Sequence, residues 1–110
     1  AATVDYRKSA RYRRLKKSLI QSCQARGLCE EAYMDKVEEY MDFWVRRQQL
    51  RDDVDERGIT VYDPKRGADV ENRNVSAEVS VSRNMLAIYA ALGFRDEAAK
   101  AAPRDEDDEL

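Results

Sequence analysis

Histidine is absent from these 110 residues, and cysteine, proline and glycine are scarce, with two, two and four copies. Without histidine the chain has no Ser-His or Cys-His nucleophile pair and lacks the commonest nitrogen ligand for metals. Two cysteines, Cys23 and Cys29, are too few for a disulfide framework or a four-cysteine zinc site. We expect both to be small buried residues in a reducing cytoplasm. No apolar run approaches the roughly 20 residues of a membrane span, so we expect no membrane partner.

Enzyme motifs are missing as well. The sequence contains neither a G-x-x-x-x-G-K-[ST] phosphate loop nor a G-x-G-x-x-G turn. Asp53, Asp55 and Gly58 occupy the first, third and sixth positions of a calcium loop, but Arg57 occupies the fifth and Pro64 the twelfth, where a bidentate glutamate is required. We therefore predict no catalytic residues, no metal site and no cofactor.

Charge is distributed unevenly, although the net charge is only -2. Residues 1–26 carry a net charge of +7, whereas residues 27–110 carry a net charge of -9. Such a basic segment can neutralise nucleic-acid phosphates without reading bases. The alternatives are a helix face that only keeps the protein soluble and, more weakly, contact with an anionic membrane surface. The candidate DNA-binding residues are Arg7, Lys8, Arg11, Arg13, Arg14, Lys16 and Lys17.

Hydrophobic periodicity predicts a mainly α-helical fold. In residues 5–26, Tyr12, Leu15, Leu19 and Cys23 recur at steps of three and four, which predicts a basic amphipathic helix that packs on its neighbour and ends at Gly27. Residues 30–57 predict a central helix of about 42 Å, an unusual length for so small a domain.

The central helix carries more apolar surface than one neighbouring helix can cover. One stripe runs through Val37, Tyr40 and Trp44, and a second, rotated stripe runs through Phe43, Leu50 and Val54. Because a second copy would supply the missing core, we predict a homo-oligomer in which Trp44 is both a core residue and an anchor between subunits. The candidate interface residues are Tyr40, Phe43, Trp44, Leu50 and Val54.

The helical period is lost after Gly58. Residues 59–62 are β-branched and aromatic, residues 63–67 have turn chemistry, and residues 69–72 supply a return strand, which together predict a short β-hairpin. Asn74 or Ser76 is expected to cap a C-terminal helix that stops at Gly93. The expected organisation is a flexible N-terminus at residues 1–4, a single helical domain at residues 5–94, and an acidic, disordered tail at residues 95–110.

The order of these elements resembles that of phage terminase small subunits. The resemblance covers about residues 11–94, and in two places the sequence departs from the family: Val75 stands where the family has proline, and Arg95-Asp96 stands where Thr-Pro is usual. The stretches that match are Leu15–Ile20, Arg26–Leu28, Val37–Tyr40, Glu56–Val61, Asn74-Val75, Asn84–Ile88 and Leu92–Phe94.

The resemblance implies a non-catalytic protein of a phage or prophage that takes part in packaging the viral genome. Such a subunit assembles as a ring, binds double-stranded viral DNA in the host cytoplasm and regulates a separate large terminase subunit that holds the ATPase and nuclease. Two alternatives stay open, a dimeric helical DNA-binding regulator and a protein-interaction adaptor with no nucleic-acid role. The mass in solution separates the ring from the dimer, and DNA binding separates both from the adaptor.

Overall fold

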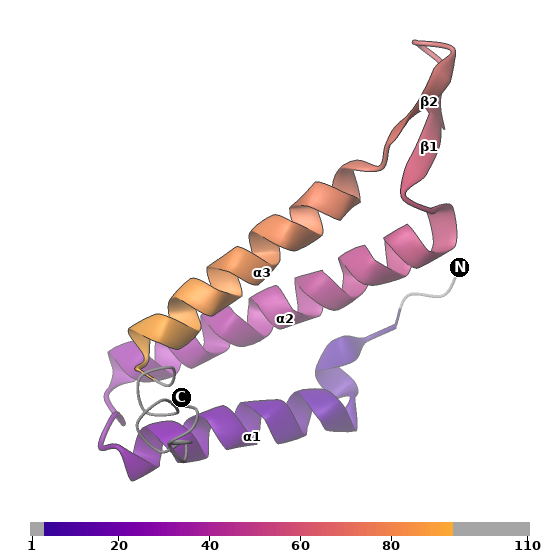
Figure 1. Ribbon diagram of the computed structural model, residues 1–110. Helices are drawn as coiled ribbons and strands as arrows, with labels where there is room; N and C mark the ends of the chain where they lie inside the picture. Colours follow the sequence, from indigo (N-terminus) through magenta and orange to yellow (C-terminus); the bar gives the residue numbers. More distant parts are fainter. Residues whose placement is uncertain (1–3, 94–110) are drawn as a thin grey trace, which may run out of the picture.

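A computed structural model describes residues 4–93, and the expectations for residues 1–3 and 94–110 lie outside this range. The described chain confirms a mainly helical fold in which a short antiparallel hairpin separates the long central helix from the C-terminal helix (Figure 1). The elements are a short 3-10 helix η1 (Tyr6–Lys8), α1 (Ala10–Ala25), α2 (Glu31–Arg57), β1 (Thr60–Asp63), β2 (Ala68–Glu71) and α3 (Arg73–Ala91).

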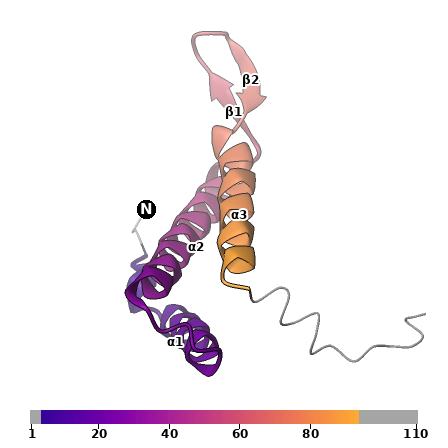
Figure 2. The same cartoon turned by 90° about the vertical axis from the view of Figure 1, so that its left-hand side faces the viewer.

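The helices form an open arrangement around α2. Helix α3 runs antiparallel beside α2, while α1 lies against a different side of α2, and the hairpin projects beyond the end where α2 stops and α3 starts (Figures 1 and 2). The Cα radius of gyration is 18.2 Å, compared with about 13 Å for a compact domain of 100 residues. Each helix therefore leaves much of its surface uncovered within one chain.

The hydrophobic core lies where the three helices meet. Helix α2 contributes most to it because it contacts both other helices, and Met41 and Cys23 are completely buried. The buried apolar residues are Tyr12, Leu19 and Cys23 from α1, Val37, Met41, Trp44 and Val45 from α2, and Met85, Ile88 and Leu92 from α3 and its cap.

The prediction for the cysteines was right for Cys23 and wrong for Cys29, which is exposed. The reason is the turn after α1, where Gly27 has a φ of 75° and the Leu28 N–H donates to the Cys23 carbonyl oxygen at 2.8 Å. This closure brings Leu28 rather than Cys29 against the core, as is usual when a glycine ends a helix in the left-handed conformation.

The N-terminal segment is not one helix from residue 5. Ser9 is extended, with φ -73° and ψ 151°, and its hydroxyl oxygen accepts a hydrogen bond of 3.1 Å from the Tyr12 N–H. A serine in this position satisfies an N–H that has no partner within the helix, so α1 begins at Ala10. The preceding residues form η1 instead, which turns back toward α2.

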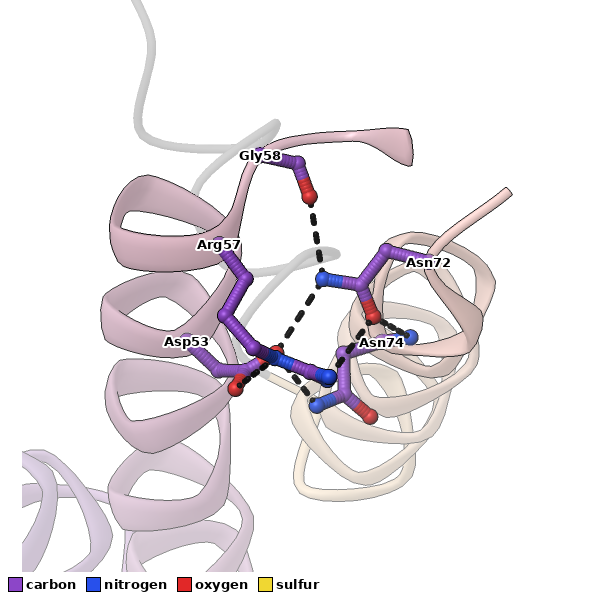
Figure 3. Close-up of polar contacts among 5 residues, drawn as sticks. All are labelled: Asp53, Arg57, Gly58, Asn72 and Asn74. Carbon is purple, nitrogen blue, oxygen red and sulfur yellow. Dashed lines mark hydrogen bonds and ion pairs between the residues drawn. The ribbon is translucent and has the colours of Figure 1, made fainter. Parts of the chain in front are cut away.

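Asn72 joins three elements through one buried side chain, which is only 1% exposed. Its Oδ1 accepts from the Asn74 N–H at 3.0 Å and caps α3, while its Nδ2 donates to the Gly58 carbonyl at 3.0 Å and to Asp53 Oδ2 at 3.1 Å (Figure 3). The expected cap at Asn74 or Ser76 was therefore wrong. The Asn74 side chain turns instead to α2, where its Nδ2 donates to Asp53 Oδ2 at 2.8 Å.

Asp53 is the anionic centre of this network. Arg57, one turn further along α2, donates to both of its carboxylate oxygens, at 2.7 and 2.9 Å. Arg57 first, and then Asn72 and Asn74, hold the pKa of Asp53 well below its usual range. The pKa of Asp53 is thus lower in the folded chain than in the unfolded chain, where it is about 3.9, so the ionised carboxylate stabilises the fold. This stabilisation is present at neutral pH and is lost as the pH falls through the pKa that Asp53 has in the folded chain.

The hairpin is shifted from its expected position by one residue on each strand. Thr60 pairs with Glu71 and Asp63 with Ala68, whereas Ile59 and Asn72 lie just below the strands, joined by a hydrogen bond of 2.8 Å from the Asn72 N–H to the Ile59 carbonyl. Asn72 is not part of β2 because its side chain caps α3 and donates a hydrogen bond to Asp53. The same residue therefore sets the base of the hairpin and the start of α3.

We predict that Asn72→Ala lowers the free energy of unfolding by about 2–4 kcal/mol, since it removes a helix cap and leaves buried hydrogen-bonding groups without partners. Urea unfolding followed by circular dichroism measures the change. Asn84→Ala is the matched control, because Asn84 is exposed on the same helix and its replacement is expected to change stability by no more than about 0.5 kcal/mol. Equal effects of the two substitutions would contradict the role given to Asn72.

Candidate nucleic-acid interface

Three cations lie on the outward side of α1. Leu19 and Cys23 face the core, and at about 100° per residue Arg14 and Lys17 fall on the opposite side, with Arg11 at its edge. All three are exposed, and within residues 4–93 none of their side chains takes part in an ion pair or hydrogen bond. We call Arg11, Arg14 and Lys17 the α1 cationic face.

Two other candidate DNA-binding residues are already paired with α2. Arg7 Nη1 lies 2.9 Å from Asp42 Oδ1, and Lys16 Nζ lies 2.6 Å from Glu38 Oε2. Each of these carboxylates, through its hydrogen bond, raises the pKa of its cation. Single exposed pairs contribute only about 0–1 kcal/mol, but the two lie at opposite ends of the basic segment and hold it against α2.

Lys8 and Arg13 lie at the junction between η1 and α1. An Arg13 guanidinium N–H donates to the Lys8 carbonyl at 2.6 Å, and Lys8 Nζ is 3.9 Å from Asp5 Oδ2. Both cationic side chains are exposed. They therefore extend the positive surface around the start of α1 while the Arg13 contact fixes the turn.

The far end of α1 is fixed by Arg26, to which the sequence analysis assigned no contact. Its Nη1 and Nη2 donate to the carbonyls of Leu92 and Gly93 at 3.1 and 2.7 Å. A guanidinium is favourable there because the last carbonyls of a helix have no partner within the helix and carry partial negative charge. Gly93 has a φ of 79°, which favours glycine, and a Cβ on it would lie 2.7 Å from Arg26 Nη2, so a larger residue would displace the guanidinium. Leu92 and Gly93 lie 66 and 67 residues from Arg26 in the sequence, so no local sequence pattern predicts these hydrogen bonds.

Trp44 lies inside the single chain, with 3% of its surface exposed. The Tyr6 ring packs edge-on against it at 6.0 Å between centroids, and the Tyr12 ring lies at 5.9 Å. The Tyr6 hydroxyl donates to Asp52, and this hydrogen bond raises the pKa of Tyr6. Trp44 therefore joins η1 and α1 to α2 and has almost no surface to offer a second chain.

The other four candidate interface residues are half-buried. Tyr40 packs against Tyr89 of α3 at 6.4 Å, and Phe43 packs on the core with the Arg46 guanidinium 5.8 Å from its ring. Leu50 and Val54, further along α2, are also only partly exposed. The structure thus uses much of the long helix's apolar surface within one chain, through α3 on one side and η1 and α1 on another.

Exposed apolar surface is found instead on α3 and the hairpin. Val79 and Leu86 are 49% and 53% exposed, and with Val75 and Ser82 they form a stripe over a shallow hollow. Ile59 and Tyr62 at the hairpin are 66% and 64% exposed. We call Val75, Val79, Ser82 and Leu86 the outer α3 stripe. Val75, Val79 and Leu86 recur at the same helical spacing as the buried Met85 and Ile88, so the sequence alone does not separate the outer α3 stripe from the core side of the helix.

Residues 4–93 provide neither a metal site nor a membrane-spanning helix. No group of three or more histidine, cysteine, aspartate or glutamate side chains there is arranged to hold a metal ion. Asp53, considered above as a calcium ligand, is committed to Arg57, Asn72 and Asn74. None of the described helices is both long enough and apolar enough to cross a membrane.

The sequence matches the family described as "Phage terminase, small subunit" over residues 13–109. The chain therefore belongs to the phage terminase small subunit family, which confirms the resemblance drawn from its sequence and supports a role in phage DNA packaging. Comparison with curated proteins and with solved structures gave no significant match.

Proposed function

We propose that this chain binds double-stranded viral DNA through the α1 cationic face, as a non-catalytic packaging protein that regulates a large terminase subunit in the host cytoplasm. The observation that carries the proposal is the set of three exposed, unpaired cations on α1 in the described part of the chain. The family membership supports the same role.

The α1 cationic face is suited to phosphates rather than to bases. Arg11 and Lys17 are separated by six residues, or about 9 Å of helix, and duplex DNA carries a charge about every 3.4 Å on each strand. A helix that lies along a strand can therefore set all three side chains against neighbouring phosphates. Helix α1 is held by Arg7, Lys16 and Arg26 before any DNA binds, so little order must be gained on binding.

The exposed apolar surface supports assembly into a homo-oligomer larger than a dimer, with a ring as the proposed form. We place the contact between copies on the outer α3 stripe together with Ile59 and Tyr62 of the hairpin, which are exposed, rather than on Trp44, which is not. Repetition of the α1 cationic face around such an assembly would let several weak contacts act together on a long duplex.

For DNA binding, we predict that Arg14→Ala with Lys17→Ala weakens binding to all duplexes alike and flattens the dependence of log affinity on log salt by up to about 2 per protomer engaged. Each lost phosphate contact removes about 0.9 from that slope because one fewer counterion is released. Fluorescence anisotropy of a long labelled duplex at several salt concentrations measures both quantities.

The matched control is Lys65→Ala with Arg66→Ala, which removes the same charge from the hairpin turn, far from α1 (Figure 1). We expect it to leave the salt slope nearly unchanged. Equal slopes for the native chain and the α1 variant would show that the α1 cationic face only keeps the protein soluble.

For assembly, we predict that Leu86→Glu lowers the mass in solution, because it places a charge on a stripe that would be buried between copies. Light scattering at several concentrations measures the mass, and circular dichroism confirms that the helices persist. Ser80→Glu is the control, since Ser80 is exposed on α3 about 120° around the helix from Leu86. A native chain that is monodisperse as a monomer at micromolar concentration contradicts the proposed assembly, and a stable dimer favours the dimeric regulator.

A further inference from the structure

The strongest run of negative charge in the sequence is Asp105–Glu109, five consecutive acidic residues. The strongest unpaired positive surface in the described residues is the α1 cationic face. We infer that this acidic segment docks on the α1 cationic face of its own chain and competes there with DNA. The competition rests on the proposed function, whereas the docking itself does not.

The point at which the chain leaves the described structure favours this contact. Gly93, the last described residue, is held at the C-terminal end of α1 by the 2.7 Å hydrogen bond from Arg26. Eleven residues separate Gly93 from Asp105, and an extended chain of that length reaches up to about 40 Å. Along α1, Lys17 lies about 14 Å and Arg11 about 22 Å from Arg26. The acidic segment is thus able to reach the whole face without leaving its own chain.

Cations elsewhere are less available to the acidic segment. Arg57 is held by Asp53 at 2.7 Å, Arg51 by Glu78 at 2.9 Å, and Lys36 by Glu39 at 3.1 Å. In residues 4–93, only α1 carries three exposed cations along one side of a helix without an acidic partner. A segment attached by a short length of chain acts at an effective concentration near the millimolar range, so even a weak attraction is sufficient for docking.

The consequence for DNA is a competition between carboxylates and phosphates for the same side chains. While the acidic segment is docked, DNA must displace it and gains less from counterion release. The segment therefore lowers both the affinity and the salt dependence of DNA binding. This differs from a general repulsion between DNA and an acidic protein, which any added or removed negative charge would change in the same way.

Docking is tested without DNA by a zero-length carbodiimide cross-linker, which joins a lysine amine only to a carboxylate in contact with it. We expect mass spectrometry to find Lys17 joined to residues 105–109, at low but not at high salt. Lys65 is exposed in the hairpin turn, beyond the N-terminal end of α3 and far from α1 (Figure 1). It is the internal control and should not be joined to residues 105–109. Mixed light and heavy isotopic chains show whether each cross-link lies within one chain. Cross-links mainly between chains, or equal yields at Lys65, would overturn the inference.

Competition is tested by a variant in which the acids of residues 105–109 become Asn or Gln. We expect it to bind a long duplex more tightly than the native chain, with a salt slope steeper by up to about 2.7 per protomer for three regained phosphate contacts. When the salt concentration rises from about 50 to 200 mM, the ratio of the variant's DNA affinity to that of the native chain should fall by up to roughly 40-fold. A control variant makes the same change in net charge elsewhere, with Asp35→Asn, Asp55→Asn, Glu56→Gln, Asp69→Asn and Glu71→Gln.

The two experiments separate the inference from the proposed function. Cross-links at Lys17 without any DNA binding would uphold docking and contradict the DNA role. DNA binding that depends on Arg14 and Lys17, without those cross-links and with equal gains for the two charge variants, would uphold the DNA role and overturn docking.

Discussion

The buried side chain of Asn72 is the constraint on which the arrangement of the other elements depends. It caps α3, binds the carbonyl that ends α2 and joins the Asp53 carboxylate, all within 3.1 Å. These bonds set where α3 starts and how it lies against α2. The start of α3 in turn decides where Leu92 and Gly93 meet Arg26. The position of α1 is therefore linked to a polar network at the other end of the molecule.

Five of the seven basic residues near the N-terminus divide into two kinds because α2 is acidic where the basic segment meets it. Arg7 pairs with Asp42 and Lys16 pairs with Glu38, and these two ion pairs hold the basic segment against α2. Arg11, Arg14 and Lys17 point away from α2 and keep their charge available to an outside anion. A surface of this kind requires both groups, since fixed cations present a defined spacing to phosphates and mobile ones do not.

The sequence predicted the helices, the hairpin and the core side of α1 because each depends on a local period or a glycine stop. It missed the cap at Asn72, since Asn74 and Ser76 are equally good caps by composition and only Asp53, nineteen residues away, decides among them. It predicted Trp44 both as a core residue and as an anchor between subunits, and the core assignment is confirmed. It did not predict that Tyr6 covers the Trp44 ring, because that contact depends on the break at Ser9. The exposed stripe on α3 could not be separated from the core face without the position of α2.

The central claim is that DNA lies against the outward side of α1, and lysine modification in the presence of a long duplex tests it most directly. Lys17 belongs to the α1 cationic face, while Lys36 and Lys65 are exposed on α2 and in the hairpin turn. The account predicts that DNA slows acetylation of Lys17 several-fold and leaves Lys36 and Lys65 unchanged. Unchanged reactivity at Lys17 on a chain that is bound to DNA, or protection at Lys65 alone, would contradict it.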